Sequence, residues 1–181
     1  MPSTALIVTD MLNRYEHPDA DALIRSVRSS LPAVRQLIAE SRRRDVQVVY
    51  VNDNHDDWCA GRAEIVEYAL GGPEPELVEP IIPPDDIPFV VKARHSAFYE
   101  TQLDYFLRHQ EIERLILVGQ VTEQCILYSA LDAYVRHYRV VVARDAVAHI
   151  HQDLADASLR MMERNMRAEI VTADSAFDDG Q

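Results

Sequence analysis

The sequence predicts an α/β domain with three layers, in which helices cover both faces of a mostly parallel sheet of about six strands. Two observations predict this fold class. Short runs rich in β-branched residues are apolar along their length, as strands buried on both faces are. These runs alternate with segments of helical periodicity, which is the pattern of βαβ units. The predicted strands are residues 5–8, 46–51, 89–91, 112–118, 139–142 and 169–171.

Helices are expected between most of these strands. The first should follow Ser29 and Ser30 and carry Pro32 in its first turn, where the missing N–H is tolerated. Its apolar stripe would consist of residues 31, 34, 37 and 38, spaced so that they share one helix face. Further helices are expected at residues 101–109, 123–137 and 152–166.

Residues 52–88 interrupt this alternation. They contain a helix-like patch at residues 63–70 and six of the nine prolines of the chain. Because proline lacks an N–H donor and resists helix formation, we expect an ordered, extended insertion that runs over the surface. Such an insertion often forms a lid or a subunit contact, although a simple connection is an equal alternative. No linker divides the chain, so residues 1–181 are predicted to form a single domain.

Composition limits the class of partner. The formal net charge is −12, from 18 basic and 30 acidic residues, which disfavours binding to nucleic acid or to an anionic membrane. The chain contains two cysteines, Cys59 and Cys125, and its amino-terminal residues form neither a basic leader nor a long apolar segment. We therefore expect a cytoplasmic protein with free thiols that acts on a small molecule.

Three reactive side chains stand at equivalent places in the predicted topology. Asp10 and Lys92 each follow a predicted strand directly, and Cys125 follows another strand after a short turn. The carboxyl ends of parallel strands meet at one edge of a sheet, so these groups are expected to converge there. Cys125 would also lie at the start of a helix, where the helix dipole favours the thiolate.

The three groups together are sufficient for covalent acyl transfer. A Cys125 thiolate attacks a carbonyl carbon, Asp10 takes the thiol proton, and the charge of Lys92 orients both. Backbone N–H groups of residues 120–125 are placed to face the developing oxyanion. An alternative pairs Cys125 with a histidine, of which His95, His149 and His151 are candidates. No spacing in the sequence places any of them near the thiol.

These motifs resemble those of the isochorismatase-like cysteine hydrolases, a family with a Rossmann-like fold that includes nicotinamidases and carbamoylases. The resemblance lies in the strand that ends at Asp10, in Lys92-Ala-Arg-His-Ser-Ala-Phe98, in Gly119-Gln-Val-Thr-Glu-Gln-Cys125 and in Val140-Val-Val-Ala-Arg-Asp-Ala146. It extends from residue 5 to about residue 171.

The resemblance implies specific roles. Asp10, Lys92 and Cys125 would fill the catalytic triad of the family, and the backbone amides of Val121 and Cys125 would form the oxyanion hole. A non-proline cis peptide would fall at Gln120–Val121. Members of the family often assemble as dimers or tetramers, so a homodimer or homotetramer is expected.

A metal site is not expected. Nicotinamidases carry one near the second strand, built from an aspartate and two or more histidines, and Asp53 with His55 could form its first half. The next histidine, His95, lies forty residues later, so the ligand set is incomplete for a transition metal. We predict no metal and no cofactor.

Candidate substrate-binding residues are chosen by their location, either close after a triad residue in sequence or in the insertion. Aromatic side chains at a strand-end cleft can stack on a planar acyl group, but they can equally pack a lid. The candidates are Asn13, Tyr15, Trp58, His95, Phe98 and Thr122. Arg94 could bind a substrate carboxylate or be a solvated surface charge, and Asp145 could cap a turn.

Three functions remain open. The first is a cysteine-dependent hydrolase of a small amide, carbamoyl or related acyl compound that passes through a Cys125 thioester. The second is a hydrolase of an isochorismate-type vinyl ether with Asp10 as general acid. The third is a binding protein that has kept the fold without turnover. The three reactive groups favour the first function.

Overall fold

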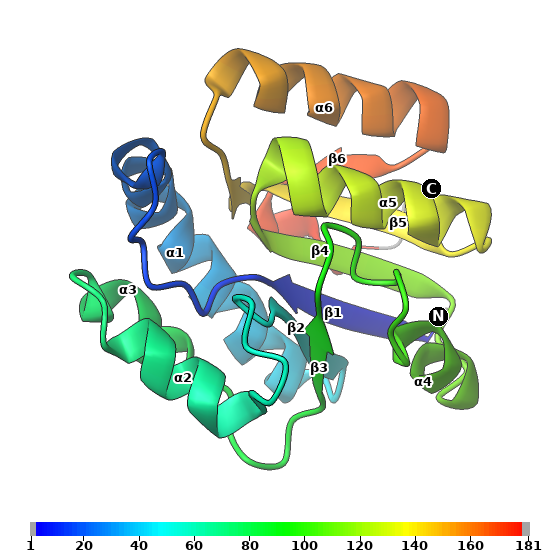
Figure 1. Ribbon diagram of the computed structural model, residues 1–181. Coiled ribbons are helices and arrows are strands. Elements are labelled where there is room, and N and C mark those ends of the chain that lie inside the picture. Colours follow the sequence, from blue (N-terminus) through cyan, green and yellow to red (C-terminus); the bar gives the residue numbers. More distant parts are fainter. Residues whose placement is uncertain (1–2, 179–181) are drawn as a thin grey trace.

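The computed structural model describes residues 3–178, which contain a six-stranded, entirely parallel sheet in the order β3-β2-β1-β4-β5-β6 (Figure 1). The predicted fold class is confirmed, and all six predicted strands are present. The strands are β1 (Thr4–Thr9), β2 (Gln47–Asp53), β3 (Phe89–Lys92), β4 (Arg114–Gln120), β5 (Arg139–Ala148) and β6 (Glu169–Val171).

Helices cover both faces of the sheet. The helices are α1 (Ala20–Arg43), α2 (Arg62–Leu70), α3 (Pro75–Val78), α4 (Leu103–His109), α5 (Leu127–Val135) and α6 (Gln152–Met166). The short helices are η1 (Glu79–Ile81), the π-helical turn η2 (Thr122–Ile126) and η3 (Ala173–Ser175). α1, α2 and α3 pack against one face, and α4, α5 and α6 against the other (Figure 1).

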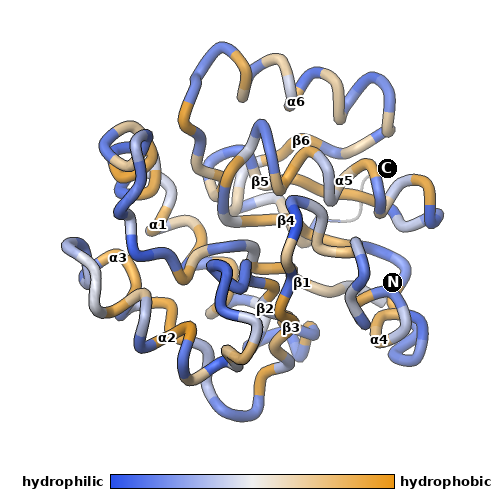
Figure 2. The backbone as a smooth tube through the Cα atoms, in the orientation of Figure 1, coloured by the Kyte–Doolittle hydropathy of each residue, from blue (hydrophilic) through white to orange (hydrophobic). Residues whose placement is uncertain are grey.

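The apolar strand sequences follow from this double coverage. Within β1, Leu6 and Val8 contact the core beneath α1, whereas Ala5 and Ile7 contact the core beneath α4 and α5. Successive side chains of a strand point to opposite faces, so a strand covered on both sides is apolar at every position. Figure 2 shows the hydrophobic residues concentrated in the strands and on the inner sides of the helices.

The first helix differs from its prediction. α1 begins at Ala20, eleven residues before the expected start at Leu31, and Pro32 lies inside it. The buried residues Leu23 and Val27 continue the apolar stripe of Leu31 upstream at helical spacing. Pro32 is on the exposed side of the helix, where water can hydrate the carbonyl that loses its partner. Burial of the stripe therefore outweighs the local penalty of proline.

The insertion at residues 52–88 is ordered, as predicted, but the prediction of an extended path was wrong for residues 75–81. Its proline-rich part contains α3 and η1, with Pro75 and Pro80 each in the first helical turn, where proline is tolerated. Leu77, Val78 and Ile81 are buried in the core beneath α1. The predicted helical patch at residues 63–70 corresponds to α2.

None of the helices in the described residues combines the length and the apolar character that crossing a membrane requires.

Gly119 sets the separation of the two central strands at their carboxyl ends. It pairs with Thr9 in register and has a φ of +112°. A Cβ atom on residue 119 would lie 2.1 Å from the carbonyl oxygen of Thr9, which is backbone and cannot move aside. Only glycine satisfies both the conformation and the contact.

Gly119→Ala should therefore destabilise the protein by roughly 3 kcal/mol or more, because backbone strain and the clash with Thr9 act together. The free energy of unfolding in denaturant is the measurement. Gly71→Ala is the matched control, since Gly71 has a helical φ of −73° and faces the flexible side chain of Arg14. The control should be neutral or slightly stabilising. A similar loss in both variants would contradict this account of Gly119.

Candidate active site

The carboxyl ends of β1 and β4 lie side by side at the centre of the sheet. From β1 the strand order continues toward β2 and β3, and from β4 it continues toward β5 and β6. This change of direction is the topological switch point at which open α/β sheets bind ligands. Asp10 follows β1 at this point, while Gln120 ends β4 and leads into η2, which carries Cys125.

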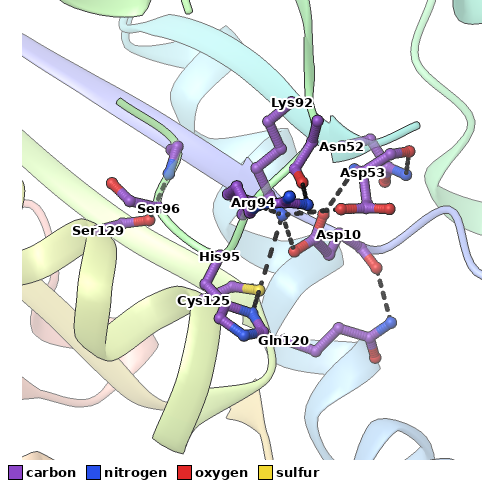
Figure 3. A network of polar contacts seen from close by, with 12 residues as sticks. Asp10, Asn52, Asp53, Lys92, Arg94, His95, Ser96, Gln120, Cys125 and Ser129 are labelled. Atoms are coloured by element: carbon purple, nitrogen blue, oxygen red, sulfur yellow. Dashed lines mark hydrogen bonds and ion pairs between the residues drawn. The ribbon is translucent and has the colours of Figure 1, made fainter. Parts of the chain in front are cut away.

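Lys92 reaches this point from β3, two strands away. It pairs with Asp53 of β2 in register, and its long side chain extends toward Asp10 (Figure 3). The ammonium Nζ lies 2.8 Å from Asp10 Oδ2 and 3.7 Å from Cys125 Sγ. Nζ also donates a hydrogen bond of 3.0 Å to the carbonyl of Arg94. The structure thus brings together the three reactive side chains that the sequence predicted to converge.

Backbone and side-chain contacts fix Asp10. Its Oδ1 accepts a hydrogen bond of 2.8 Å from the Asp53 N–H, and its backbone carbonyl accepts one of 2.6 Å from Gln120 Nε2. The Asp10 N–H donates to the carbonyl of Val51 at 2.9 Å. Asp10 has a φ of 53°, a left-handed conformation that aspartate tolerates better than most residues. Both β2 and β4 therefore hold the carboxylate in place.

The charges of the site are coupled. Burial lowers the pKa of Lys92, but the negative charges of Asp10 and Asp53 and the hydrogen bond to Asp10 outweigh it, and the net pKa is above its ordinary value. Burial raises the pKa of Cys125 strongly, the Asp10 carboxylate raises it further, and the positive charge of Lys92 opposes both. The ammonium is therefore charged at neutral pH, and the resting sulfur is a thiol.

This result corrects the expected bias of Cys125 toward thiolate. The expectation relied on a helix amino terminus, whose stabilisation of a negative charge rarely exceeds about 2 kcal/mol. Here Cys125 is 8% exposed and is adjacent to the carboxylate of Asp10. Desolvation and the neighbouring negative charge together exceed the effect of the dipole and of Lys92.

The turn before Cys125 has the geometry that the resemblance implied. The Gln120–Val121 peptide bond is cis, which confirms that expectation. The backbone of Val121 hydrogen-bonds the sulfur of Cys125 and lowers its pKa slightly against the larger effects. The Thr122 hydroxyl donates to the carbonyl of Ala148 at 2.8 Å, so Thr122 ties η2 to β5.

A cavity of about 280 Å³ opens over the triad. Its lining comes from the carboxyl ends of β1 to β4, from the loops that follow β1, β2, β4 and β5, and from the start of α1. The lining residues are Asp10, Asn13, His17, Asp19, Leu23, Asp53, His55, Lys92, Gln120, Val121, Gln124, Cys125 and Ile150. A larger cavity of about 1030 Å³ lies at the amino-terminal ends of the strands, beside Thr4, Gln47 and Arg114. It is away from the three reactive groups.

The candidate substrate-binding residues divide into two groups. Asn13 lines the cavity, and the buried Tyr15 contacts it indirectly, since its hydroxyl donates to Gln120 Oε1 at 3.5 Å. Trp58 is 77% exposed and lies with Arg94 beside another cavity of about 420 Å³, which Lys92 also lines. Phe98 is buried in the core against Tyr138. Trp58 and Phe98 thus follow β2 and β3 in sequence but do not face Cys125.

His95 also lies close to the sulfur of Cys125. Its Nδ1 is 3.8 Å from Cys125 Sγ (Figure 3). Its ring stacks on Tyr128 of α5. The segment is held by the Ala97 N–H, which donates to the Ser129 hydroxyl at 2.9 Å. No sequence spacing linked His95 to the thiol, because their proximity depends on this contact with α5.

Sequence reasoning missed several lining residues. His17, Asp19 and Leu23 lie just before or in the first turn of α1, whose start was predicted eleven residues too late. The buried stripe that begins at Leu23 was the available signal. Gln124 precedes Cys125 directly, and Ile150 comes from the loop after β5.

The remaining candidates have structural contacts. Asp145 Oδ1 accepts the Ala173 N–H at 2.8 Å, which is the capping role considered for it. Asp145 lies within β5, which continues to Ala148 instead of ending near residue 142. Cys59 is exposed in the insertion, and both cysteines are free thiols.

Asp53 and His55 contact each other and neighbouring groups of the protein. Asp53 Oδ1 accepts the His55 N–H at 2.9 Å, and Asp53 Oδ2 lies 3.7 Å from Lys92 Nζ. His55 Nε2 lies 2.9 Å from the carbonyl of Leu12, to which it can only donate. Residues 3–178 contain no cluster of three histidine, cysteine or acidic side chains suited to hold a metal ion.

Known proteins resemble the chain over most of its length. The sequence profile of the isochorismatase domain matches residues 4–175. A probable inactive nicotinamidase of Arabidopsis thaliana is 29% identical, with 89% of this chain and 88% of the relative covered. The maleamate amidohydrolase of Pseudomonas putida is 26% identical, with coverage of 96% and 84%.

A solved structure supports the same assignment. The N-carbamoylsarcosine amidase of Thermoplasma acidophilum superposes with a TM-score of 0.72 at 29% identity, covering 95% of this chain and 97% of that one. The profile match, the fold and the full-length similarity agree. This chain belongs to the isochorismatase family of hydrolases.

Proposed function

We propose that this protein is a metal-independent cysteine hydrolase that cleaves a small amide, carbamoyl or related acyl compound through a thioester on Cys125. One observation carries the proposal: a buried ammonium lies 2.8 Å from a carboxylate and 3.7 Å from a thiol, and all three groups line one small cavity. The similarity to an amidohydrolase and to an amidase supports amide chemistry.

Acylation begins from the neutral thiol. Asp10 takes the proton of Cys125 as the sulfur attacks the substrate carbonyl carbon, so a thiolate forms only during the attack. Lys92 stabilises the negative charge that passes from the carboxylate to the sulfur. The raised pKa of Cys125 makes this base necessary, because little thiolate is present beforehand.

The same three side chains, together with backbone N–H groups, carry the tetrahedral intermediate on to product. The carbonyl oxygen becomes an oxyanion, which the backbone N–H groups of Val121 and Cys125 stabilise. Asp10 returns its proton to the leaving nitrogen as the carbon–nitrogen bond breaks, and the thioester remains on Cys125. Water then attacks the thioester with Asp10 as base, which releases the carboxylic acid and restores the thiol.

A second function deserves a direct test. In a vinyl ether hydrolase, Asp10 would protonate the substrate and no thioester would form. The proximity of the sulfur to both charged groups favours the thioester route instead. One relative is named a probable inactive nicotinamidase. The experiment below therefore also tests whether this chain is a binding protein without turnover.

We also propose that the protein is a cytoplasmic homodimer or homotetramer. Tyr128, Leu131 and Val135 lie exposed at helical spacing on α5, and Trp58 is exposed in the insertion. Exposed apolar surface of this kind is typical of subunit contacts. The free thiols of Cys59 and Cys125 are consistent with a reducing compartment.

The thioester can be observed as a mass increase. Wild-type protein incubated with a panel of small amides, carbamoyl compounds and vinyl ethers should gain a transient acyl mass on Cys125. Cys125→Ala should show no adduct and lose at least about 10³-fold in turnover. Cys59→Ser is the control and should retain both. Unchanged turnover in Cys125→Ala would assign the chemistry to Asp10, and no turnover with any compound would favour a binding protein.

Asp10→Asn should lower turnover and at the same time make the Cys125 thiol easier to ionise. Turnover should fall by about 10²-fold or more because the base is lost. The pKa of Cys125 should nevertheless fall, since the burial effect remains but the carboxylate that raises it is gone and Lys92 stays. Ultraviolet titration of the thiolate in a Cys59→Ser background measures this pKa.

His95→Ala provides the comparison for that experiment. It removes the other side chain near the sulfur and should reduce turnover far less than Asp10→Asn. A larger loss in His95→Ala than in Asp10→Asn would make His95 the base. Full activity of Asp10→Asn, with its fold intact by circular dichroism, would refute the proposed triad.

A further inference from the structure

His95 contacts the reacting sulfur but has no step in the proposed mechanism. Its Nδ1 lies 3.8 Å from Cys125 Sγ, which is within hydrogen-bonding distance for sulfur (Figure 3). We infer that His95 is a further catalytic residue, whose Nδ1–H donates a hydrogen bond to the sulfur while the sulfur carries negative charge. This inference rests on the proposed function, because it concerns the charge that develops on Cys125 in that reaction.

The other contacts of the sulfur decide the direction of this hydrogen bond. The Cys125 thiol hydrogen-bonds the carboxylate of Asp10, which can only accept. The single hydrogen of the thiol is therefore directed at Asp10, and the sulfur offers lone pairs to its remaining neighbours. Those neighbours are Lys92 Nζ at 3.7 Å, the backbone of Val121 and His95 Nδ1. A favourable contact with His95 thus requires a hydrogen on Nδ1.

The surroundings of Nε2 permit this tautomer of His95. Within residues 3–178, no side chain or backbone group hydrogen-bonds Nε2, and the residue is exposed. Nε2 can therefore stay unprotonated and accept from water, while Nδ1 keeps its hydrogen. Asp10 is only 8% exposed and already accepts the thiol hydrogen, so it remains the base.

Backbone contacts on both sides of His95 hold it beside the sulfur. Before it in the chain, the carbonyl of Arg94 accepts a hydrogen bond of 3.0 Å from Lys92 Nζ. After it, the Ala97 N–H donates to the hydroxyl of Ser129 at 2.9 Å, and this hydroxyl group is fully buried. The position of His95 is therefore fixed by the triad lysine on one side and by α5 on the other.

The ring of His95 rests on the same helical segment that carries the sulfur. Tyr128 follows Cys125 by three residues, which is about one helical turn. The rings of His95 and Tyr128 stack with their centroids 5.5 Å apart and an angle of 24° between their planes. This stack orients the imidazole relative to Cys125, in addition to the backbone contacts.

A further donor matters because Lys92 is shared among several acceptors. Its ammonium lies 2.8 Å from Asp10, closer than the 3.7 Å to the sulfur, and it also donates to the carbonyl of Arg94. Burial raises the pKa of Cys125, so negative charge on the sulfur is costly. Hydrogen bonds to a charged acceptor are stronger than those to a neutral one. The contact with His95 therefore strengthens as charge develops.

The hydrogen bond acts in both halves of the reaction. During acylation the thiol proton passes to Asp10 as the sulfur–carbon bond forms, and Nδ1–H stabilises the charge on the sulfur. During hydrolysis water attacks the thioester carbon, Asp10 takes a proton from the water, and the carbon–sulfur bond breaks with its electron pair on the sulfur. Asp10 then returns the proton to the sulfur. His95 neither gains nor loses a proton in either half.

Two substitutions separate the hydrogen bond from the packing of the ring. His95→Asn keeps an N–H donor close to the position of Nδ1, since both nitrogens are bonded to Cγ, but it removes the ring. His95→Phe keeps a ring that can stack on Tyr128 but has no donor. His109→Phe is the matched control, because His109 is also exposed and stacks on Tyr105 within α4.

Alkylation by iodoacetamide reports the stabilisation of charge on the sulfur without any turnover. In a Cys59→Ser background Cys125 is the only thiol, and the alkylation rate at about pH 8 should fall roughly fivefold in His95→Phe. It should stay within about twofold of the parent rate in His95→Asn and in the control. The free energy of unfolding shows whether each variant is folded. Equal rates in the parent and His95→Phe, or equal losses in both His95 variants, would overturn the inference.

Acyl-enzyme kinetics separate this inference from the proposed function. With a compound that acylates Cys125, mass spectrometry should show formation and decay of the adduct slowed roughly tenfold in His95→Phe but near the parent rates in His95→Asn. If wild-type protein forms no adduct with any compound while the order of alkylation rates holds, the proposed function fails and the donor role of His95 stands. If the adduct forms and decays at parent rates in His95→Phe, the inference is wrong and the proposed function stands.

Discussion

The buried ion pair between Lys92 and Asp10 is the interaction on which the site depends. A buried ammonium is costly unless a charged partner and further hydrogen bonds compensate for lost water. Here Asp10, the carbonyl of Arg94 and, at longer range, Asp53 provide that compensation. The pair links the ends of β1 and β3 across β2. The position of these strand ends therefore also determines which charges act on the Cys125 thiol.

The same arrangement explains why the resting sulfur is protonated. Lys92 alone would stabilise a thiolate, but Asp10 neutralises much of its charge, and burial favours the neutral thiol. A carboxylate beside a neutral thiol is a base in position, whereas a preformed thiolate would not need one. In the proposed mechanism this pairing couples proton transfer to the attack of the sulfur.

Strand packing places these groups within reach of one another. The absence of a side chain at Gly119 lets the ends of β1 and β4 approach, and Gln120 then reaches back to the carbonyl of Asp10. Asp53 supplies both an N–H to Asp10 and a carboxylate near Lys92. These contacts hold Asp10, Lys92 and Cys125 together at the strand ends, and loops supply much of the remaining cavity lining.

The sequence by itself determined the strands, the parallel sheet and the convergence of Asp10, Lys92 and Cys125, because strand periodicity and strand-end position are local properties of the chain. Only the tertiary structure decided the start of α1, the helical path of the insertion and the place of His95. In each case burial against distant residues outweighed a local signal such as proline. The ionisation of Cys125 was likewise decided by tertiary structure, since desolvation and the charge of Asp10 exist only in the folded protein.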